Sequence, residues 1–276
     1  MADWLSGGAN DANAAMRDFI LQRPFTENLS LRKRVSRLEA AECLREAGRS
    51  PSIPLEFTSQ FGEDCWLWDL FGAQRDGFFI EAGAFDGHLF SVSYAFEALG
   101  WKGLLVEPIP EQFEKARQRR PYSRVVHAAL GPPGSSGSCT FQLVEGGAAT
   151  GAPAMLSHIA PTAANTRDVR AAQASVRSVT VPYTTLTDLL SDHQGPIDFA
   201  SIDVEGGEID LLRGFDLERL RPRVLLVEEG LPAPTSPIMQ YMSRFAYTPI
   251  AYVWINRVYI RNDETELLRR AQRIPM

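Results

Sequence analysis

Short apolar runs alternate with amphipathic segments over most of the 276-residue chain. An apolar run at 78–80 ends in Glu81 and leads into a loop of small residues. A segment with apolar positions at helical spacing follows, and Gly100 stops it. A second apolar run at 104–106 then ends in Glu107. This order of strand, glycine turn, helix and strand predicts a βαβ unit.

The alternation continues along the chain and predicts an α/β fold. Because strands alternate with helices, we expect a doubly wound, mostly parallel sheet, and paired runs near the C-terminus predict an antiparallel hairpin that closes it. Further strands are expected at 124–130, 139–144, 179–181, 197–204, 223–229, 247–254 and 257–261. Further helices are expected at 59–71, 110–120, 185–190, 208–213 and 238–246.

Residues 1–50 differ from the rest and are expected to form an N-terminal helical extension. Apolar residues recur there at helical spacing, flanked by basic ones, at Leu31, Val35, Leu38, Ala41 and Leu44. We expect this helix to pack on the main domain. A dimer contact, which would make a homo-oligomer, and a lid over the substrate are the alternatives.

Residues 51–276 are expected to form one domain, because a chain of this length and 45% apolar content can bury one sizeable core. Within it, residues 145–176 are rich in Gly and Ala and lack clear periodicity. A segment this long in a compact domain is usually a functional loop. We therefore expect it to be the insertion that binds the substrate.

Composition narrows the classes of partner. A net charge of −6 argues against a nucleic-acid partner, which requires a basic patch or stripe. The three cysteines, Cys43, Cys65 and Cys139, are too few and too scattered for a disulfide framework or a Cys-based metal site. No apolar run is long enough to span a bilayer, and the N-terminus has no secretory signal. A cytoplasmic protein without a membrane partner is expected.

The βαβ unit points to an adenosine-bearing cofactor. Glycines allow a sharp turn beside a ligand, and an acid that ends the second strand accepts hydrogen bonds from ribose hydroxyls; Glu107 lies twenty residues after Gly87. A nicotinamide-type G-x-G-x-x-G loop would need glycines where Phe85 and His88 stand. The observed acid-x-Gly-x-x-x-Gly spacing is that of S-adenosylmethionine-dependent methyltransferases. A purely structural βαβ unit is the alternative.

With these residues in view, the chain resembles the FkbM family of S-adenosylmethionine-dependent methyltransferases between about residues 59 and 261. The resemblance implies a Rossmann-like class I methyltransferase fold. Three positions depart from the family pattern: Glu81, Val92 and Gly207 stand where Asp, Asn and Ala are usual. The matching motifs are Ser59-Gln60-x-Gly62-x-Asp64, Glu81-x-Gly83-Ala84-x-Asp86-Gly87, Ser91-x-Ser93-Tyr94, Gly100-Trp101-x-Gly103, Val106-Glu107-Pro108, Ala128-Ala129-Leu130-Gly131, Thr185-Leu186 and Ile202-Asp203-Val204-Glu205-Gly206-x-Glu208.

The resemblance implies a binding site for S-adenosyl-L-methionine. Glu81 would be oriented to the amino end of the cofactor and Glu107 would hold the ribose hydroxyls, while Gln60 and Asp64 would cover it. The full set of expected cofactor-binding residues is Glu81, Gly83, Ala84, Phe85, Asp86, Gly87, Ser91, Glu107, Pro108, His127, Ala128 and Asp203.

The resemblance also implies methyl transfer to a hydroxyl of a small-molecule natural product or a sugar. A hydroxyl acceptor must lose its proton, and we favour Asp203 as the base, since open α/β sheets place their sites at the carboxyl ends of strands; His158 and His88 are alternatives. No metal is expected, although Asp203, Glu205 and Glu228 are the candidates to hold Mg²⁺. A nicotinamide-dependent oxidoreductase and a catalytically inactive nucleoside-binding scaffold are the alternative functions.

Overall fold

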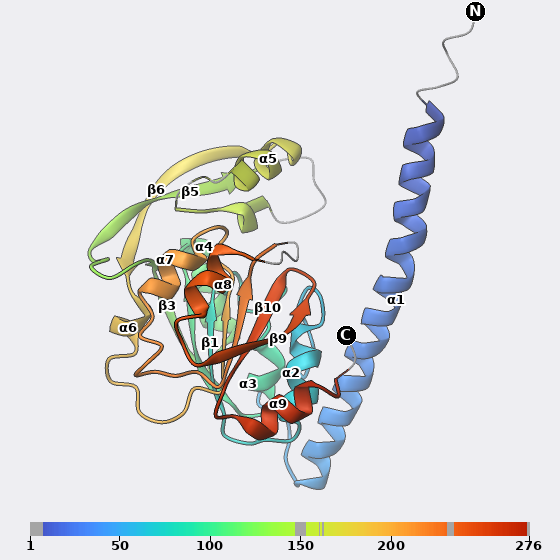
Figure 1. Cartoon of the computed structure of the whole chain (residues 1–276), viewed down its shortest axis with the longest axis vertical. Helices are drawn as coiled ribbons and strands as arrows, with labels where there is room; N and C mark the ends of the chain where they lie inside the picture. The colour runs from blue at the N-terminus through green and yellow to red at the C-terminus, as the bar shows by residue number, and fades with distance from the viewer. Residues whose placement is uncertain (1–7, 147–152, 160, 162, 231–234, 275–276) are drawn as a thin grey trace, which may run out of the picture.

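Two sheets organise the protein, seen here in a computed structural model that describes residues 8–146, 153–159, 161, 163–230 and 235–274 (Figure 1). The larger has seven strands in the order β3-β2-β1-β7-β8-β10-β9, and the smaller has three in the order β4-β6-β5. The strands are β1 (Phe78–Ala82), β2 (Lys102–Glu107), β3 (Arg124–His127), β4 (Ala129–Leu130), β5 (Ser138–Glu145), β6 (Ser175–Thr184), β7 (Phe199–Ile202), β8 (Val224–Glu228), β9 (Tyr247–Val253) and β10 (Asn256–Arg261). The helices are α1 (Gly8–Glu46), α2 (Glu63–Phe71), α3 (Tyr94–Ala98), α4 (Pro110–Arg119), the 3₁₀ helix η1 (Pro153–Leu156), α5 (Ala163–Ala171), α6 (Leu186–Leu189), α7 (Glu208–Arg213), α8 (Pro237–Met242) and α9 (Thr265–Ala271).

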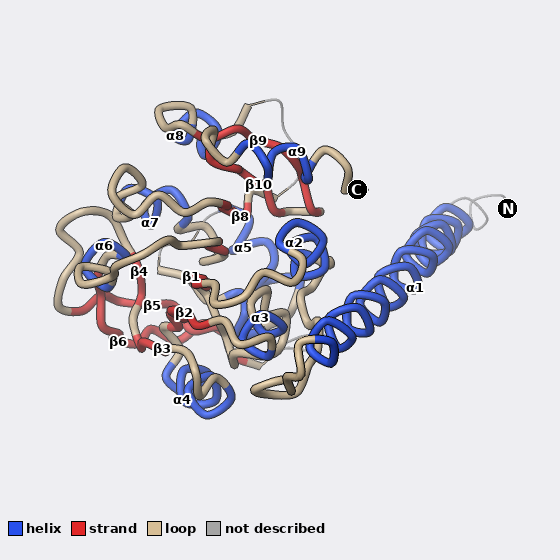
Figure 2. Tube along the Cα trace, turned by 90° about the horizontal axis from the view of Figure 1, so that it is seen from below, coloured by secondary structure: helices blue, strands red, loops and turns tan. Residues whose placement is uncertain are grey.

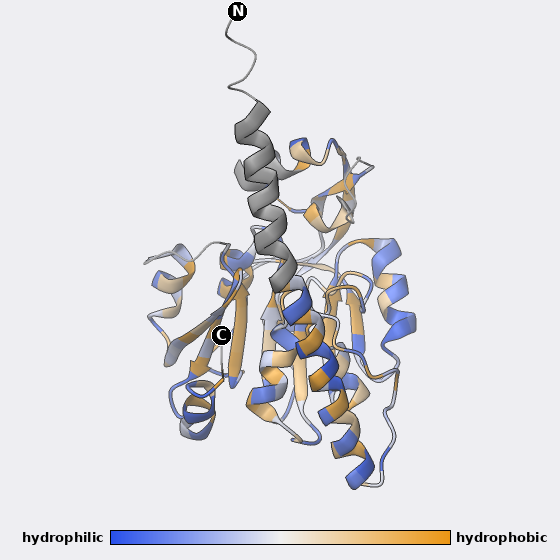
Figure 3. Cartoon of the chain, turned by 90° about the vertical axis from the view of Figure 1, so that its right-hand side faces the viewer, coloured by the Kyte–Doolittle hydropathy of each residue, from blue (hydrophilic) through white to orange (hydrophobic). Residues whose placement is uncertain are grey.

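The larger sheet is doubly wound and mostly parallel, as expected. Strand β1 pairs in parallel with β2 and β7, β2 with β3, and β7 with β8, whereas β10 pairs antiparallel with β8 and β9. The central strands are buried along nearly their whole length, because helices cover both faces. Figure 3 shows these strands as predominantly hydrophobic and the outer helices with hydrophilic sides.

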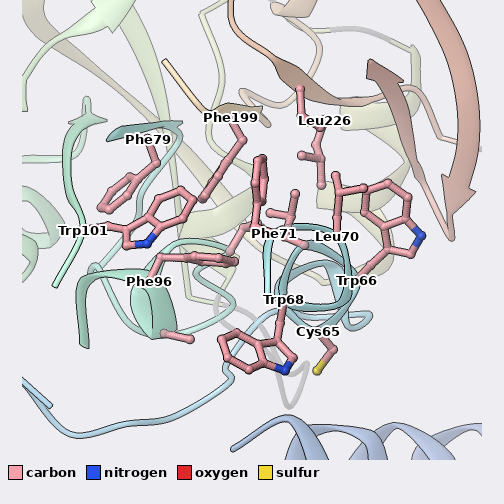
Figure 4. Packing of buried hydrophobic residues seen from close by; sticks show 14 of the residues in the cluster. Cys65, Trp66, Trp68, Leu70, Phe71, Phe79, Phe96, Trp101, Phe199 and Leu226 are labelled. Atoms are coloured by element: carbon pink, nitrogen blue, oxygen red, sulfur yellow. The ribbon is translucent and has the colours of Figure 1, made fainter. Parts of the chain in front are cut away.

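Apolar clusters fill both faces of this sheet. On one face, side chains of α2, α3 and α9 pack on the strands, with a large aromatic component (Figure 4). On the other face, α6, α7 and α8 cover the strands with mainly aliphatic side chains. The aromatic members on the first face include Trp66, Phe71, Phe79, Phe96, Trp101 and Phe199.

Some element boundaries differ from the predictions. The strand expected at 124–130 divides into β3, in the large sheet, and β4, which leaves it to pair with β6. The closing hairpin turns at Trp254 and Ile255, one residue earlier than expected, with Trp254 at a φ of 56°. Helices α5 and α9 were not predicted. Part of the predicted insertion, at 147–152, 160 and 162, lies outside the described residues.

Helix α1 confirms the N-terminal helical extension; its C-terminal part lies beside the domain and its N-terminal part extends away from it (Figure 2). The predicted packing stripe is wrong, however, because Leu31, Val35 and Leu38 are 57%, 52% and 67% exposed. Of that stripe only Leu44 is buried, as predicted, and it is joined by Ser36 and Ala40, so that this face lies against the domain. Small side chains at 36 and 40 allow the close approach of α2 that larger ones would prevent. Over the described residues, no helix is both long and apolar enough to cross a membrane.

Candidate functional site

A cleft opens at the carboxyl ends of β1, β2 and β7. The strand order places it where the sheet changes direction, between β1 and β7, which is where open α/β sheets bind ligands. The loops after these strands form its floor, while Phe141 of β5 and Met155 of η1 belong to its opposite wall. The cleft holds about 690 Å³ of empty space up to its open mouth, and we call it the main cleft.

The glycine loop after β1 is built for close backbone approach. Gly83 has a φ of +83°, and a Cβ at this position would lie 1.8 Å from the carbonyl oxygen of Asp203. The loop amides are already used: those of Gly83 and Ala84 donate to the Val106 carbonyl at 3.0 and 3.1 Å. The amide of Phe85 donates to the carboxylate of Glu107 at 2.7 Å. These three amides are therefore not free to bind the pyrophosphate of a dinucleotide.

Glu107 closes β2 at the floor of the main cleft, where it was predicted to bind ribose. Its residue exposure is only 3%, and its two carboxylate oxygens accept hydrogen bonds from the amides of Phe85 and Ile109 at 2.7 and 2.8 Å. A carboxylate has about four acceptor sites, so two remain for a ligand. Burial raises the pKa of Glu107 to about 7, despite the opposing effect of these two hydrogen bonds.

A second cavity continues from the main cleft, and we call it the acidic cavity. The two share Gly83, Phe85, Met155 and Asp203 in their walls. The acidic cavity contains about 510 Å³ of empty space, open solvent included. Its lining includes Glu63, Glu81, Asp203, Gln60, Ser201 and Asn256. Carboxyl groups on three sides favour a cationic ligand.

Glu63 and Asn256 are members of the acidic cavity that the sequence reasoning missed. They lie 193 positions apart, and the side-chain amide of Asn256 donates to the Glu63 carboxylate at 2.8 Å. The second Glu63 oxygen accepts from the amide of Phe61 at 2.9 Å. Burial raises the pKa of Glu63 to about 7. Gln60 also lines this cavity, whereas the neighbouring Asp64 holds Ser59 inside the fold.

Arg120 is a second residue that the sequence did not identify. It is 1% exposed at the end of α4, and its guanidinium pairs with Glu97 at 2.8 Å and lies 3.5 Å from Glu81. It also donates to the Gly87 carbonyl and to the hydroxyls of Ser91 and Ser93. Both hydroxyls donate in turn to Glu81. This network fixes the loop between β1 and α3 from below.

Asp203 lies in the wall of both the main cleft and the acidic cavity, next to two other carboxyl groups. Carboxyl oxygens of Asp203, Glu208 and Glu228 lie within 4.8 Å of one another. Burial and the nearby charge of Asp203 raise the pKa of Glu228 well above its ordinary range. Glu208 accepts hydrogen bonds from the amides of Val204 and Gly206 at 3.1 and 3.0 Å. The predicted metal candidate Glu205 lies in the wall of the main cleft instead.

The other predicted residues divide into two groups. Ala84 and Ser91 line the acidic cavity, and Pro108 and Ala128 line the main cleft. A second group borders neither. It comprises Asp86, Gly87, His88, His127 and His158. Asp86 accepts hydrogen bonds from the amides of His88 and Leu89, and Gly87 packs on Ala116. The ring of His127 stacks on Phe113, the ring of His88 is bonded to Glu56, and His158 is buried with its Nδ1 2.8 Å from the Leu156 carbonyl.

Comparison with known proteins identifies the family of the chain. Residues 81–249, more than half of the chain, match the family model described as the methyltransferase FkbM domain. A search of the curated proteins found no match.

Solved structures of similar arrangement share little sequence with this chain. One is the N-terminal domain of human METTL16 in complex with SAH, at 17% identity and a TM-score of 0.38, covering 82% of this chain and 80% of that one. Another is a TehB-like SAM-dependent methyltransferase from Corynebacterium glutamicum, at 11% identity and a TM-score of 0.39. The match covers 79% of this chain and 92% of that one. A third is the C-terminal domain of precorrin-6Y C5,15-methyltransferase from Rhodobacter capsulatus, at 10% identity and a TM-score of 0.36. The match covers 76% of this chain and 92% of that one. At these scores we transfer neither a site nor an acceptor.

Proposed function

Because the chain belongs to the FkbM methyltransferase family and is an S-adenosylmethionine-dependent methyltransferase, we propose that it methylates a hydroxyl oxygen of a small-molecule natural product or a sugar. The observation that carries this proposal is the position of Asp203, which lies in the walls of both the main cleft and the acidic cavity. A carboxyl group at this junction is placed to take the proton of an acceptor hydroxyl.

The residues present fit the cofactor end to end. Glu107 would accept hydrogen bonds from the ribose hydroxyls, and the apolar wall around Ala128 and Phe141 would cover the adenine. The acidic cavity would hold the methionine end, since Glu63, Glu81 and Asp203 favour positive charge there. When bound, S-adenosylmethionine supplies an electrophilic methyl group on a sulfonium centre.

The chain contributes positioning and a proton acceptor. Holding two reactants in line contributes about 7–11 kcal/mol to lowering a barrier of this kind. Asp203, when ionised, takes the proton from the hydroxyl that is methylated. The raised pKa of Glu228 keeps this neighbouring carboxyl neutral, so it does not add a second negative charge beside Asp203. A positioned base of this kind contributes about 10²–10⁴-fold to the rate.

Two alternatives have different requirements. A nicotinamide-dependent oxidoreductase needs backbone N–H groups for a pyrophosphate, and the amides of Gly83, Ala84 and Phe85 are engaged elsewhere. An inactive scaffold would bind the cofactor without turnover, so it is separated from an enzyme by a rate measurement.

The test uses S-adenosylmethionine labelled with tritium on the methyl group and a panel of hydroxylated sugars and natural products. We expect label in an oxygen-linked methyl group. At a saturating concentration of S-adenosylmethionine, the rate should be about 10²–10⁴-fold lower in Asp203→Asn. Asp210→Asn, an exposed aspartate paired with Arg213 on α7, is the matched control. Label transferred only to nitrogen or carbon, or an Asp203→Asn variant of full activity, would contradict the proposal.

A further inference from the structure

A groove with basic walls runs between α1 and the segment at 56–58. Its lining includes Lys33, Arg34 and Arg37 from the helix, and Glu56 and Thr58 from the segment. It contains about 900 Å³ of empty space, open solvent included. Three cationic side chains face one carboxylate here, although the whole chain carries a net charge of −6. We call this feature the basic groove.

The guanidinium groups of the basic groove are available to a ligand. Within the described part of the chain, neither Arg34 nor Arg37 forms an ion pair. Nearby arginines differ, since Arg32 pairs with Asp69 at 2.9 Å and Arg45 pairs with Glu42. The single acid of the groove, Glu56, is bonded to the ring of His88 at 2.7 Å, which reduces its effect on the arginines.

The basic groove lies close to the acidic cavity along the chain segment 58–60. Thr58 belongs to the wall of the groove and Gln60 to the wall of the cavity. Two residues of extended chain span only about 7 Å. Between them, Ser59 forms an isolated parallel bridge to Phe90, which also lines the cavity, and its carbonyl oxygen accepts from Lys33 Nζ. The basic groove and the acidic cavity therefore lie on either side of the segment around Ser59.

We propose that the basic groove is an anion subsite for the methyl acceptor, holding a phosphate, sulfate or carboxylate group of a hydroxylated substrate. This inference rests on the proposed function and specifies its substrate class. Planar guanidinium groups match the oxygens of these anions in a two-pronged geometry, which favours Arg34 and Arg37 as the binding groups. Lys33 adds charge while its ammonium holds the wall at Ser59.

The experiment measures the fluorescence anisotropy of the trisulfonated dye pyranine titrated with the full chain. We expect saturable binding that weakens with added salt, and an affinity about three- to thirtyfold lower in Arg34→Gln/Arg37→Gln. The matched control, Arg117→Gln/Arg213→Gln, removes the same charge from α4 and α7, where both arginines are exposed and paired. It should bind the dye as wild type does.

Competition identifies the anion. Glucose 6-phosphate, glucose 6-sulfate and glucuronate should displace the dye, and glucose should not. The competitor that displaces it at the lowest concentration identifies the anionic group that the groove prefers. Equal dye binding by the Arg34→Gln/Arg37→Gln variant, an equal loss in the control, or displacement by glucose would overturn the proposal. Calorimetry of S-adenosylhomocysteine on the same variants reports on the cofactor site separately, so failure of the groove and failure of the proposed function are distinguished.

Discussion

Replacing Glu107 by glutamine tests the ribose contact with the smallest change of shape. In the free protein the carboxylate accepts from the amides of Phe85 and Ile109 at 2.7 and 2.8 Å, which leaves about two acceptor sites for ribose hydroxyls. Glutamine has a single acceptor oxygen, so at least one charge-assisted hydrogen bond to the ribose is lost. Such bonds contribute about 1.5–3 kcal/mol each. We expect S-adenosylhomocysteine to bind about 10- to 150-fold more weakly.

Isothermal titration calorimetry at pH 8 measures this change. The control variant is Glu114→Gln, the same substitution at an exposed glutamate on α4, which should bind as wild type does. Thermal unfolding of both variants without ligand establishes that each is folded. An affinity for Glu107→Gln within about threefold of wild type would refute the assignment of this carboxylate to the ribose.

The pH dependence of binding follows from the same carboxyl group. Burial raises the pKa of Glu107 to about 7, and ribose hydroxyls donate to the ionised form, so affinity rises as the pH rises through this value. Between pH 8 and pH 6 the ionised fraction falls about tenfold, and the wild-type affinity should fall at least as much. Glu63, whose pKa burial also raises to about 7, adds to the fall. In Glu107→Gln the tenfold fall in affinity that is due to residue 107 should disappear, while the part due to Glu63 should remain. A pH profile for this variant equal to that of wild type would contradict the prediction.

Two predictions concern the scaffold of the site. In Gly83→Ala the new Cβ would lie 1.8 Å from the Asp203 carbonyl oxygen, so this variant should be destabilised by about 1–3 kcal/mol more than Gly134→Ala. Gly134 is the control because it also has a positive φ but has open space around it. Equal shifts in the thermal unfolding of the two variants would count against a tight loop at Gly83. Arg120→Met removes the cation from a buried network and should cost about 3–5 kcal/mol in denaturant unfolding, against less than about 0.5 kcal/mol for the exposed Arg117→Met on the same helix. A similar midpoint for both arginine variants would show that the network contributes little.

Local patterns predicted the parts of the fold that depend on local forces. Helix α7 begins and ends at the predicted residues, because acids suit its first turn and Gly214 follows its last residue. The strands of the βαβ unit were predicted because buried parallel strands are continuous apolar runs. The position of Glu107 followed from the end of β2.

The packing of α1 shows where periodicity fails. Two faces of this helix were available, and the more apolar one, with Leu31, Val35 and Leu38, lies in solvent. The face with Ser36 and Ala40 is buried because the partner helix α2 needs close approach there. Only the tertiary partner decides such a choice.

The same reason explains the unpredicted residues of the site. Glu63 was expected in a helix-forming segment and Asn256 in a hairpin, and only the folded chain brings them together. Arg120 ended a predicted helix, and no pattern in the sequence indicated that its side chain would be buried beneath the glycine loop. His158, the predicted alternative base, has its backbone paired with Gln142 and its ring near the Leu156 carbonyl.

The most direct measurement is the crystal structure of the protein soaked in S-adenosylhomocysteine. We predict that the ribose hydroxyls lie within hydrogen-bonding distance of Glu107, and that the amino-acid end enters the acidic cavity beside Glu63 and Asp203. A nucleoside bound elsewhere, or bound in the main cleft with its ribose away from Glu107, would contradict the account.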